Sequence, residues 1–267
     1  MLLEKKIAVV YGGGGAIGSA VAKALAGEGA QVFVAGRTLA KVEATAHAIN
    51  DAGGAAEAAE VDALDEQAVE QHANSVVDTS GRIDISVNAI GVDNGEQGVP
   101  LVAMTPDEFT EPIVFYIRNT FITARTVARH MTQQKSGVIL MLSAPMARMP
   151  TALTGSFSLA AAGVETLARQ LAAELGPDGV RVVCLRLTGI PQTATELGSH
   201  TKQVWSRAAE RLGVPFDELL EGVGGGTALQ RPLTVREVAD VAAFMASDRA
   251  TGMTGTVANV TAGAVVD

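Results

Sequence analysis

A run of glycines near the start of the chain is the clearest chemical signal in the sequence. It follows the apolar run Ile7–Tyr11 and reads Tyr11-Gly12-Gly13-Gly14-Gly15-Ala16-Ile17-Gly18. Glycines let the backbone turn sharply and approach a pyrophosphate, and the N-terminus of a following helix supplies N–H groups and positive potential. A tight turn without a ligand is the alternative, but a strand before the run and a helix after it favour phosphate binding.

The elements that must position this run alternate along the chain. Continuous apolar runs are typical of strands buried on both faces of a parallel sheet. We predict strands at Ile7–Tyr11, Gln31–Ala35, Ala55–Val61, Ile83–Asn88, Gly137–Leu142, Val180–Arg186 and Thr256–Val260. Amphipathic segments predict helices at Ile17–Glu28, Leu39–Asp51, Glu66–Asp78, Glu111–Gln134, Leu153–Leu175 and Val235–Ser247, with Asp65 as an N-cap. The order indicates one α/β domain over residues 1–267, with a doubly wound (Rossmann) seven-stranded parallel sheet and helices on both faces.

Residues 191–232 interrupt this alternation. The segment contains two short helical pieces, Lys202–Leu212 and Pro215–Glu221, and then a stretch expected to be flexible, Gly222–Thr227. An insertion beyond a strand end is a candidate lid over a substrate crevice. A solvated surface excursion is an equally open interpretation.

Composition excludes several classes of function. The net charge of −9 argues against binding to a phosphate backbone, and the aromatic content of 4% disfavours stacking on single-stranded nucleic acid. One cysteine excludes an internal disulfide framework and a multi-cysteine zinc site, and we predict no metal site. The start, Met-Leu-Leu-Glu-Lys-Lys, is unlike a secretory signal, and no apolar stretch approaches the roughly 18 residues of a membrane span. We therefore expect a cytoplasmic protein that binds neither nucleic acid nor membranes.

The ordered motifs of the chain resemble those of the short-chain dehydrogenase/reductase family, including its 3-oxoacyl reductases. The family pattern Thr-Gly-x3-Gly-x-Gly keeps its first and last glycines as Gly12 and Gly18. Its Asn-Asn-Ala-Gly stretch corresponds to residues 87–91, and residues 231–255 are similar to its C-terminal third. The resemblance covers essentially the whole chain, and it implies a nicotinamide dinucleotide as cofactor.

The resemblance also implies which residues contact that cofactor. They are Gly12, Gly14, Gly15, Ile17 and Gly18 in the loop, Arg37, Asp62 near the adenine, Asn88, Gly91 and, for the nicotinamide amide, Thr193. Enzymes that select NAD usually place an acidic residue at the end of the second strand. Here Gly36 and Arg37 stand there, and a guanidinium can pair with a 2′-phosphate. We therefore favour NADP(H) over NAD(H), although the family's second basic residue is replaced by Gly15 and Arg37 can also be a plain surface residue.

The resemblance fails at the catalytic positions. The family uses a Tyr as general acid and base, a Lys four residues later, a Ser thirteen residues before the Tyr and an Asn in the preceding long helix. These positions fall on Phe157, Ala161, Ala144 and Tyr116, with Ser143 adjacent to Ala144 and Asn119 one turn after Tyr116. Because the chain has only two Tyr and no Lys after Lys135 except Lys202, no Tyr-x3-Lys pair can form in that helix.

Two residues remain as candidate catalytic groups. Tyr116 shares a helix face with Asn119 and can approach a crevice as an acid, although packing at a helix interface is the more ordinary role for such a Tyr. Ser143 can bond a carbonyl or can satisfy local backbone. In the candidate lid, Trp205 can cover an apolar ligand or anchor the lid. Cys184, in the predicted strand Val180–Arg186, is expected to be a buried packing residue and not a nucleophile.

Two functions follow from these residues. The first is a family member that has lost the usual Tyr-dependent hydride transfer and serves as a non-catalytic or assembly-partner protein. The second is an active NADP(H)-dependent reductase of a carbonyl or activated alkene, with a non-standard proton donor such as Tyr116. The resemblance implies a homo-tetramer or dimer paired through the two long helices, or a hetero-oligomer with an active paralogue, and a small-residue face at Ala160–Gly163 is expected to allow close packing. A small apolar carbonyl compound is the expected ligand.

Overall fold

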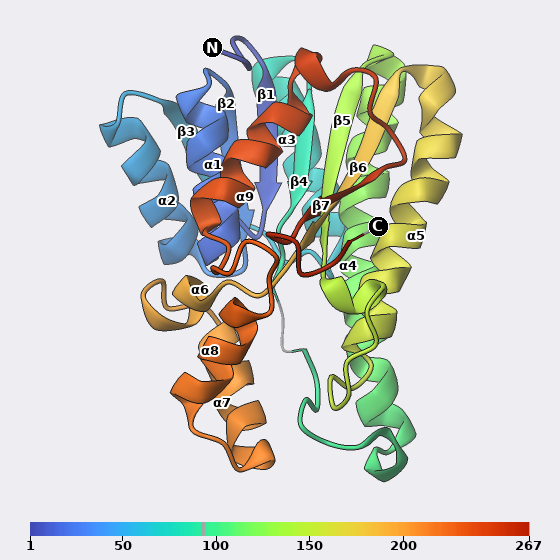
Figure 1. The fold of residues 1–267 in the computed structure, drawn as a ribbon. Coiled ribbons are helices and arrows are strands. Elements are labelled where there is room, and N and C mark those ends of the chain that lie inside the picture. The colour runs from blue at the N-terminus through green and yellow to red at the C-terminus, as the bar shows by residue number, and fades with distance from the viewer. Residues whose placement is uncertain (92–93, 267) are drawn as a thin grey trace.

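The strands of the protein form one parallel sheet, as the sequence predicted. The computed structural model describes residues 1–91 and 94–266 (Figure 1). Within these residues the sheet has seven strands in the order β3-β2-β1-β4-β5-β6-β7, all parallel. The strands are β1 (Ile7–Tyr11), β2 (Gln31–Gly36), β3 (Ala55–Glu60), β4 (Ile85–Asn88), β5 (Gly137–Ser143), β6 (Val180–Leu187) and β7 (Val257–Val260). The order reverses direction between β1 and β4, and ligands of such sheets bind at the carboxyl ends of the strands beside this point.

Helices cover both faces of the sheet, which confirms the predicted fold class. On one face lie α1 (Ala16–Gly27), α2 (Leu39–Asp51) and α9 (Val235–Ala246), and on the other lie α3 (Glu66–Ser80), α4 (Pro106–Gln134) and α5 (Phe157–Leu175). Each face of the sheet buries its own apolar core. Asp65 is the N-cap of α3, as predicted. Its carboxylate accepts hydrogen bonds from the backbone N–H groups of Gln67 and Ala68.

Three predicted boundaries differ from the structure by four or more residues, and the others agree within two. The helix predicted from Glu111 begins at Pro106, because Thr105 and Glu108 form a capping box before it and Pro suits the first turn. The helix predicted from Leu153 begins at Phe157, because Leu153 and Gly155 have positive φ and cannot continue a right-handed helix. The stretch predicted to be flexible after Glu221 is helical to Gly225, where the Val223 side chain packs against Gly189.

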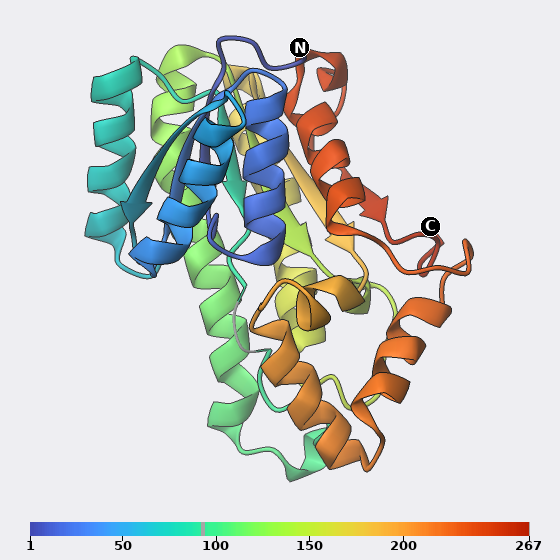
Figure 2. The same cartoon turned by 90° about the vertical axis from the view of Figure 1, so that its left-hand side faces the viewer.

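The segment 191–232 forms a separate layer beyond the carboxyl ends of the strands. It contains α6 (Pro191–Thr195), α7 (Thr201–Leu212) and α8 (Phe216–Gly225). Figure 2 shows these helices beneath the sheet, on the same side as the N-terminal half of α4, which also extends past the strands. Residues 191–232 therefore lie where a lid over the crevice would lie.

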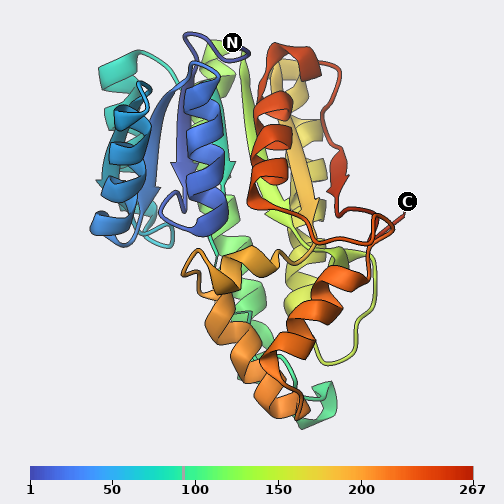
Figure 3. The same ribbon diagram turned by 60° about the vertical axis from the view of Figure 1, so that its left-hand side comes forward.

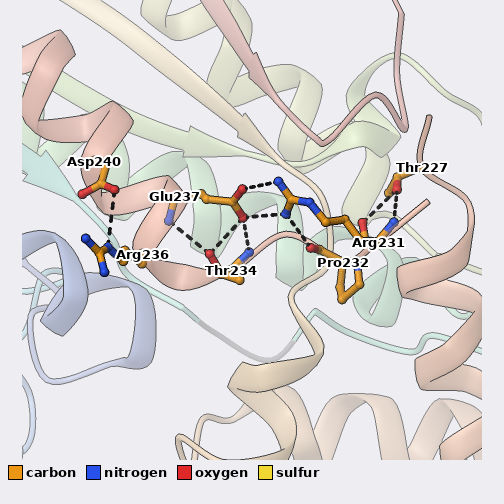
Figure 4. A network of polar contacts seen from close by, with 7 residues as sticks. All are labelled: Thr227, Arg231, Pro232, Thr234, Arg236, Glu237 and Asp240. Atoms are coloured by element: carbon orange, nitrogen blue, oxygen red, sulfur yellow. Dashed lines mark hydrogen bonds and ion pairs between the residues drawn. The ribbon is translucent and has the colours of Figure 1, made fainter. Parts of the chain in front are cut away.

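The segment rejoins the body of the protein through a polar network (Figure 4). Arg231 makes a two-pronged ion pair with Glu237 on α9, through Nη1 to Oε2 at 3.1 Å and Nη2 to Oε1 at 2.6 Å. Glu237 also closes a capping box with Thr234 at the start of α9. Thr227 Oγ1 donates to the carbonyl of Arg231 at 2.8 Å, so the end of the segment is fixed to the helix that follows.

The small-residue face predicted on α5 packs inside the chain. Ala160 and Ala161 are buried, and a Cβ on Gly163 would come 2.5 Å from Ile117 Cδ1 of α4. Gly163 therefore allows close helix packing, here against α4 of the same chain, and the pairing of the long helices between subunits stays a prediction.

Candidate active site

The glycine loop brings three backbone segments into contact at the carboxyl end of β1. Gly12 has a φ of +80°, and a Cβ there would lie 2.5 Å from the carbonyl oxygen of Ala89. A Cβ on Gly18 would lie 2.2 Å from the carbonyl oxygen of Gly12, so α1 packs on the loop at a distance that only glycine permits. No described side chain caps the N-terminus of α1 at Gly15, and the positive end of this helix stays available to an anion.

A small pocket adjoins the loop between the ends of β2 and β3. It is lined by Gly12, Gly36, Arg37, Asp62 and Ile90, together with Tyr11, Ala35, Val61, Ala63, Leu64, Phe115 and Asn119. Arg37 is exposed, and Asp62 Oδ1 accepts from the N–H of Leu64 at 3.0 Å. The pocket thus brings together three residues that the resemblance assigned to the cofactor, Gly12, Arg37 and Asp62.

Asn88, at the end of β4, is fixed by α4. Its Nδ2 donates to Asn119 Oδ1 at 3.2 Å and to Thr123 Oγ1 at 2.9 Å, and all three side chains are buried. Asn119 Nδ2 donates in turn to the carbonyl of Phe115 at 2.6 Å. This polar chain couples β4 to α4 at the crevice, and the sequence alone did not place Asn119 in it.

Gly91 and Thr193 meet the lid segment. The ring of His200 lies against Gly91, where a Cβ would come 2.2 Å from His200 Cε1. Thr193, on α6, is buried and donates its hydroxyl to the carbonyl of Ile190 at 2.7 Å. Both residues line the same cavity as Ile17 and Asn88, in agreement with a shared site.

That cavity has a volume of about 200 Å³. Phe157 and Ala161 of α5 form one wall, Tyr116 and Thr120 of α4 lie beside them, and Ser143 stands at the end of β5. Trp205 closes the cavity from α7, and its ring also packs against Gly189. It therefore both covers the cavity and anchors the lid, the two roles that the sequence left open.

Tyr116 projects into this cavity beside the position that the resemblance gives to the family tyrosine. Its ring centroid lies 5.4 Å from that of Phe157, and the two planes are tilted by 55°. Tyr116 Oη donates to Asn94 Oδ1 at 2.6 Å. Among the described residues that line the cavity there is no Lys, Arg, Asp or Glu, so no formal charge of either sign faces Tyr116 from them.

Ser143 faces a charged pair that the sequence analysis missed. Its Oγ donates to Glu165 Oε1 at 2.9 Å, and Glu165 on α5 is paired with Arg186 on β6. Arg186 was a detectable signal, because it is a charged residue within the apolar run that follows Arg181 in β6. Cys184, on the same strand, is fully buried as expected, and burial raises the pKa of its thiol to about 12.

The lid contacts the loop that precedes α4. Arg211, near the end of α7, forms an ion pair with Glu96 and donates from Nη1 to the carbonyl of Gln97 at 2.9 Å. Figure 3 shows α7 and α8 as one layer below the sheet, with the loop and the start of α4 at its lower edge. These contacts join α7 of the candidate lid to the loop before α4.

The described residues contain neither a metal-binding cluster nor a helix suited to crossing a membrane. No group of three or more His, Cys, Asp or Glu side chains in residues 1–91 and 94–266 is arranged to hold a metal ion. Over the same residues, no helix has the length and apolar character that a membrane crossing needs.

Comparison with known proteins identifies the family. Residues 14–265 match the family model described as enoyl-(acyl carrier protein) reductase. The chain is 32% identical over 260 residues to the short-chain reductase protein NovJ of Streptomyces niveus, covering 97% of this chain and 94% of that protein. It is 31% identical to galactitol 2-dehydrogenase of Rhizobium johnstonii, covering 98% and 95%. The crystal structure of NAD+-bound xylitol dehydrogenase has the same fold, with a TM-score of 0.86 at 22% identity and 98% of each chain covered. The chain belongs to the short-chain dehydrogenase/reductase family of oxidoreductases.

Proposed function

We propose that the protein is an NADP(H)-dependent reductase that acts on the carbonyl or activated alkene of a small apolar compound, with Tyr116 as the proton donor. The observation that carries the proposal is the contact between Tyr116 and Phe157, whose ring centroids are 5.4 Å apart. A phenol from α4 stands beside the place where the family has its tyrosine on α5. The names of the relatives, a reductase and two polyol dehydrogenases, also favour a working enzyme.

The residues of the crevice fit a nicotinamide dinucleotide. The uncapped start of α1 and the loop of Gly12, Gly14, Gly15, Ile17 and Gly18 suit the pyrophosphate, because backbone N–H groups and the helix dipole attract an anion there. Arg37 suits a 2′-phosphate and Asp62 the adenine side, while Asn88, Gly91 and Thr193 stand on the nicotinamide side. The bound cofactor would supply the hydride.

Tyr116 holds a proton at its Oη, within hydrogen-bond reach of Asn94. In the proposed reaction Tyr116 Oη donates to the substrate oxygen and then releases its proton to it, while the apolar walls and Trp205 exclude water. Ala161 presents a methyl group where the family has an ammonium, so Tyr116 works without that charge. We therefore expect slower turnover than in family members that keep the Tyr and Lys pair.

The test is NADPH oxidation with a panel of apolar ketones and enones, measured for the wild type and for Tyr116→Phe. We expect the variant to lose about 10²–10⁴-fold in turnover, the usual contribution of a positioned general acid. Its NADPH affinity, measured by calorimetry, should stay within twofold. Phe157→Tyr in the Tyr116→Phe background returns a phenol to the neighbouring wall and should recover part of the activity. Full turnover in Tyr116→Phe would exclude Tyr116 as the acid.

A non-catalytic role in an oligomer is the second candidate function. It is favoured by Phe157 and Ala161, which leave the family's Tyr and Lys positions without an ionisable group. On this proposal the chain binds the cofactor, or a partner, and works with an active paralogue. Tight NADPH binding without turnover of any ketone by the purified protein, and turnover on co-expression with the paralogue, is the expected result. Ordinary turnover by the purified protein alone would exclude this role.

A further inference from the structure

A buried ion pair adjoins the cavity. Glu165 on α5 accepts from Arg186 through two bonds, Nε to Oε1 at 2.8 Å and Nη2 to Oε2 at 3.0 Å. Each side chain is only 3% exposed. These two parallel charge-assisted bonds join the carboxylate to the guanidinium in a fixed orientation.

Ser143 links this pair to the cavity. Its hydroxyl has one hydrogen, which it donates to Glu165 Oε1 at 2.9 Å. An ionised carboxylate can only accept, so the direction of this bond is fixed. Ser143 also lowers the pKa of the Cys184 thiol, but burial raises that pKa more, to about 12, and a neutral thiol is a weaker acceptor than the carboxylate. Ser143 therefore lines the cavity with its only hydroxyl hydrogen donated to Glu165. The lone pairs of its oxygen remain able to accept a hydrogen bond from a ligand.

We propose that Ser143 is a hydrogen-bond acceptor for the ligand, and that the cavity selects an apolar compound that carries a hydroxyl group. A serine with a free hydrogen would bind a carbonyl or ether oxygen as readily as a hydroxyl. Here Glu165 removes that option, because an acceptor atom of the ligand would meet only the lone pairs of Ser143. The inference rests on the proposed function, in which Tyr116 donates to the carbonyl oxygen of the substrate and Ser143 accepts from the hydroxyl group of the reduced form.

The test compares two probes with the same skeleton, 1-phenylethanol and its methyl ether. Both oxygens accept hydrogen bonds, but only the alcohol donates one. Calorimetric titrations are made with saturating NADPH, under which neither probe is reduced or oxidised. We expect the alcohol to bind the wild type about five- to tenfold more tightly, the effect of one hydrogen bond. Ser143→Ala should bring the ratio of the two affinities to about one.

A double variant separates the acceptor role from the mere presence of the serine. Glu165→Met with Arg186→Met replaces the ion pair by apolar side chains of similar length, a change that buried pairs often tolerate. Ser143 then keeps its hydroxyl but has a free hydrogen, so the ether also finds a donor and the ratio should fall to about one. The matched control is Glu237→Met with Arg231→Met, an exposed pair outside the cavity lining, which should leave the wild-type ratio unchanged.

Failure of this inference is distinguishable from failure of the proposed function. Equal affinities of the wild type for the two probes, tighter binding of the ether, or no binding of either probe would overturn the acceptor role. Oxidation of NADPH with acetophenone, measured separately, reports the reductase activity. Selective alcohol binding without turnover would support the inference while removing the reductase proposal.

Discussion

At the scale of single residues, the proposed NADP(H) preference depends on the guanidinium of Arg37. It is exposed and stands beside Gly36 and Asp62 at the carboxyl edge of the sheet. A charge-assisted bond to a 2′-phosphate contributes about 1.5–3 kcal/mol. Arg37→Ala is therefore expected to weaken NADPH binding by about tenfold or more and to change NADH binding by less than twofold, as measured by calorimetry.

The control for this prediction is Arg236→Ala, which removes an exposed arginine on α9 whose ion-pair partner is Asp240. It should leave both affinities unchanged. Equal losses for NADPH and NADH in Arg37→Ala would mean that this side chain does not read the 2′-phosphate.

At the scale of elements, the junction of β1 with α1 depends on the absence of a side chain at Gly18. A Cβ there would come 2.2 Å from a backbone oxygen, whereas a Cβ on Gly27 of the same helix meets nothing within 4 Å. Gly18→Ala is expected to lower the free energy of unfolding by about 1–3 kcal/mol, the usual range for forced overpacking. Gly27→Ala should raise it by up to about 1 kcal/mol through helix propensity. Urea denaturation measures both, and equal effects would contradict the packing argument.

The connection from the lid to α9 predicts a dependence of stability on pH. The hydrogen bonds from Arg231, and then that from the Thr234 backbone, lower the pKa of Glu237 to about 2. A depressed folded-state pKa contributes stability above the unfolded value of about 4.3, and this contribution is lost as the pH falls toward 2. Glu237→Gln should therefore lower Tm relative to the wild type at pH 6, and the difference should shrink between pH 4 and pH 2.

Salt provides the second readout for this pair. Because 48% of the Arg231 side chain and 36% of the Glu237 side chain are exposed, ions screen the attraction between them. The Tm difference at pH 6 should decrease in 1 M NaCl. A difference that persists unchanged at pH 2.5 would show that charge is not its cause.

At the scale of the whole molecule, the exposed faces of the two long helices predict self-association. Val114 and Phe121 of α4 and Leu159 of α5 are 56%, 41% and 48% exposed. We expect sedimentation velocity to give a dimer or tetramer of the 27.4 kDa chain. Phe121→Glu with Leu159→Glu should shift it toward monomer, because charges cannot be buried unpaired at an interface. Val102→Glu, at a residue that is 99% exposed outside these helices, is the control.

The fold and the geometry of the glycine loop could be predicted from the sequence because they depend on local patterns. Runs of apolar residues specify buried strands, and a glycine run between a strand and a helix specifies a tight turn at the helix N-terminus. Helix boundaries were mispredicted where local sequence signals conflict. Pro112 inside α4 obscured its start, although the capping box at Thr105 and Glu108 marks it.

The contacts between residues of the larger cavity could not be predicted from the sequence, because they depend on tertiary structure. That Tyr116 lies against Phe157, and that Ser143 donates its hydrogen to a carboxylate held by Arg186, are contacts between different elements. Spacing along one helix predicts only which residues share its face. Which face meets which strand is decided by how side chains pack when helices and sheet exclude water together. The sequence by itself therefore determined the fold and the glycine loop at the start of α1, whereas tertiary packing decided which groups line the cavity and how their hydrogens are directed.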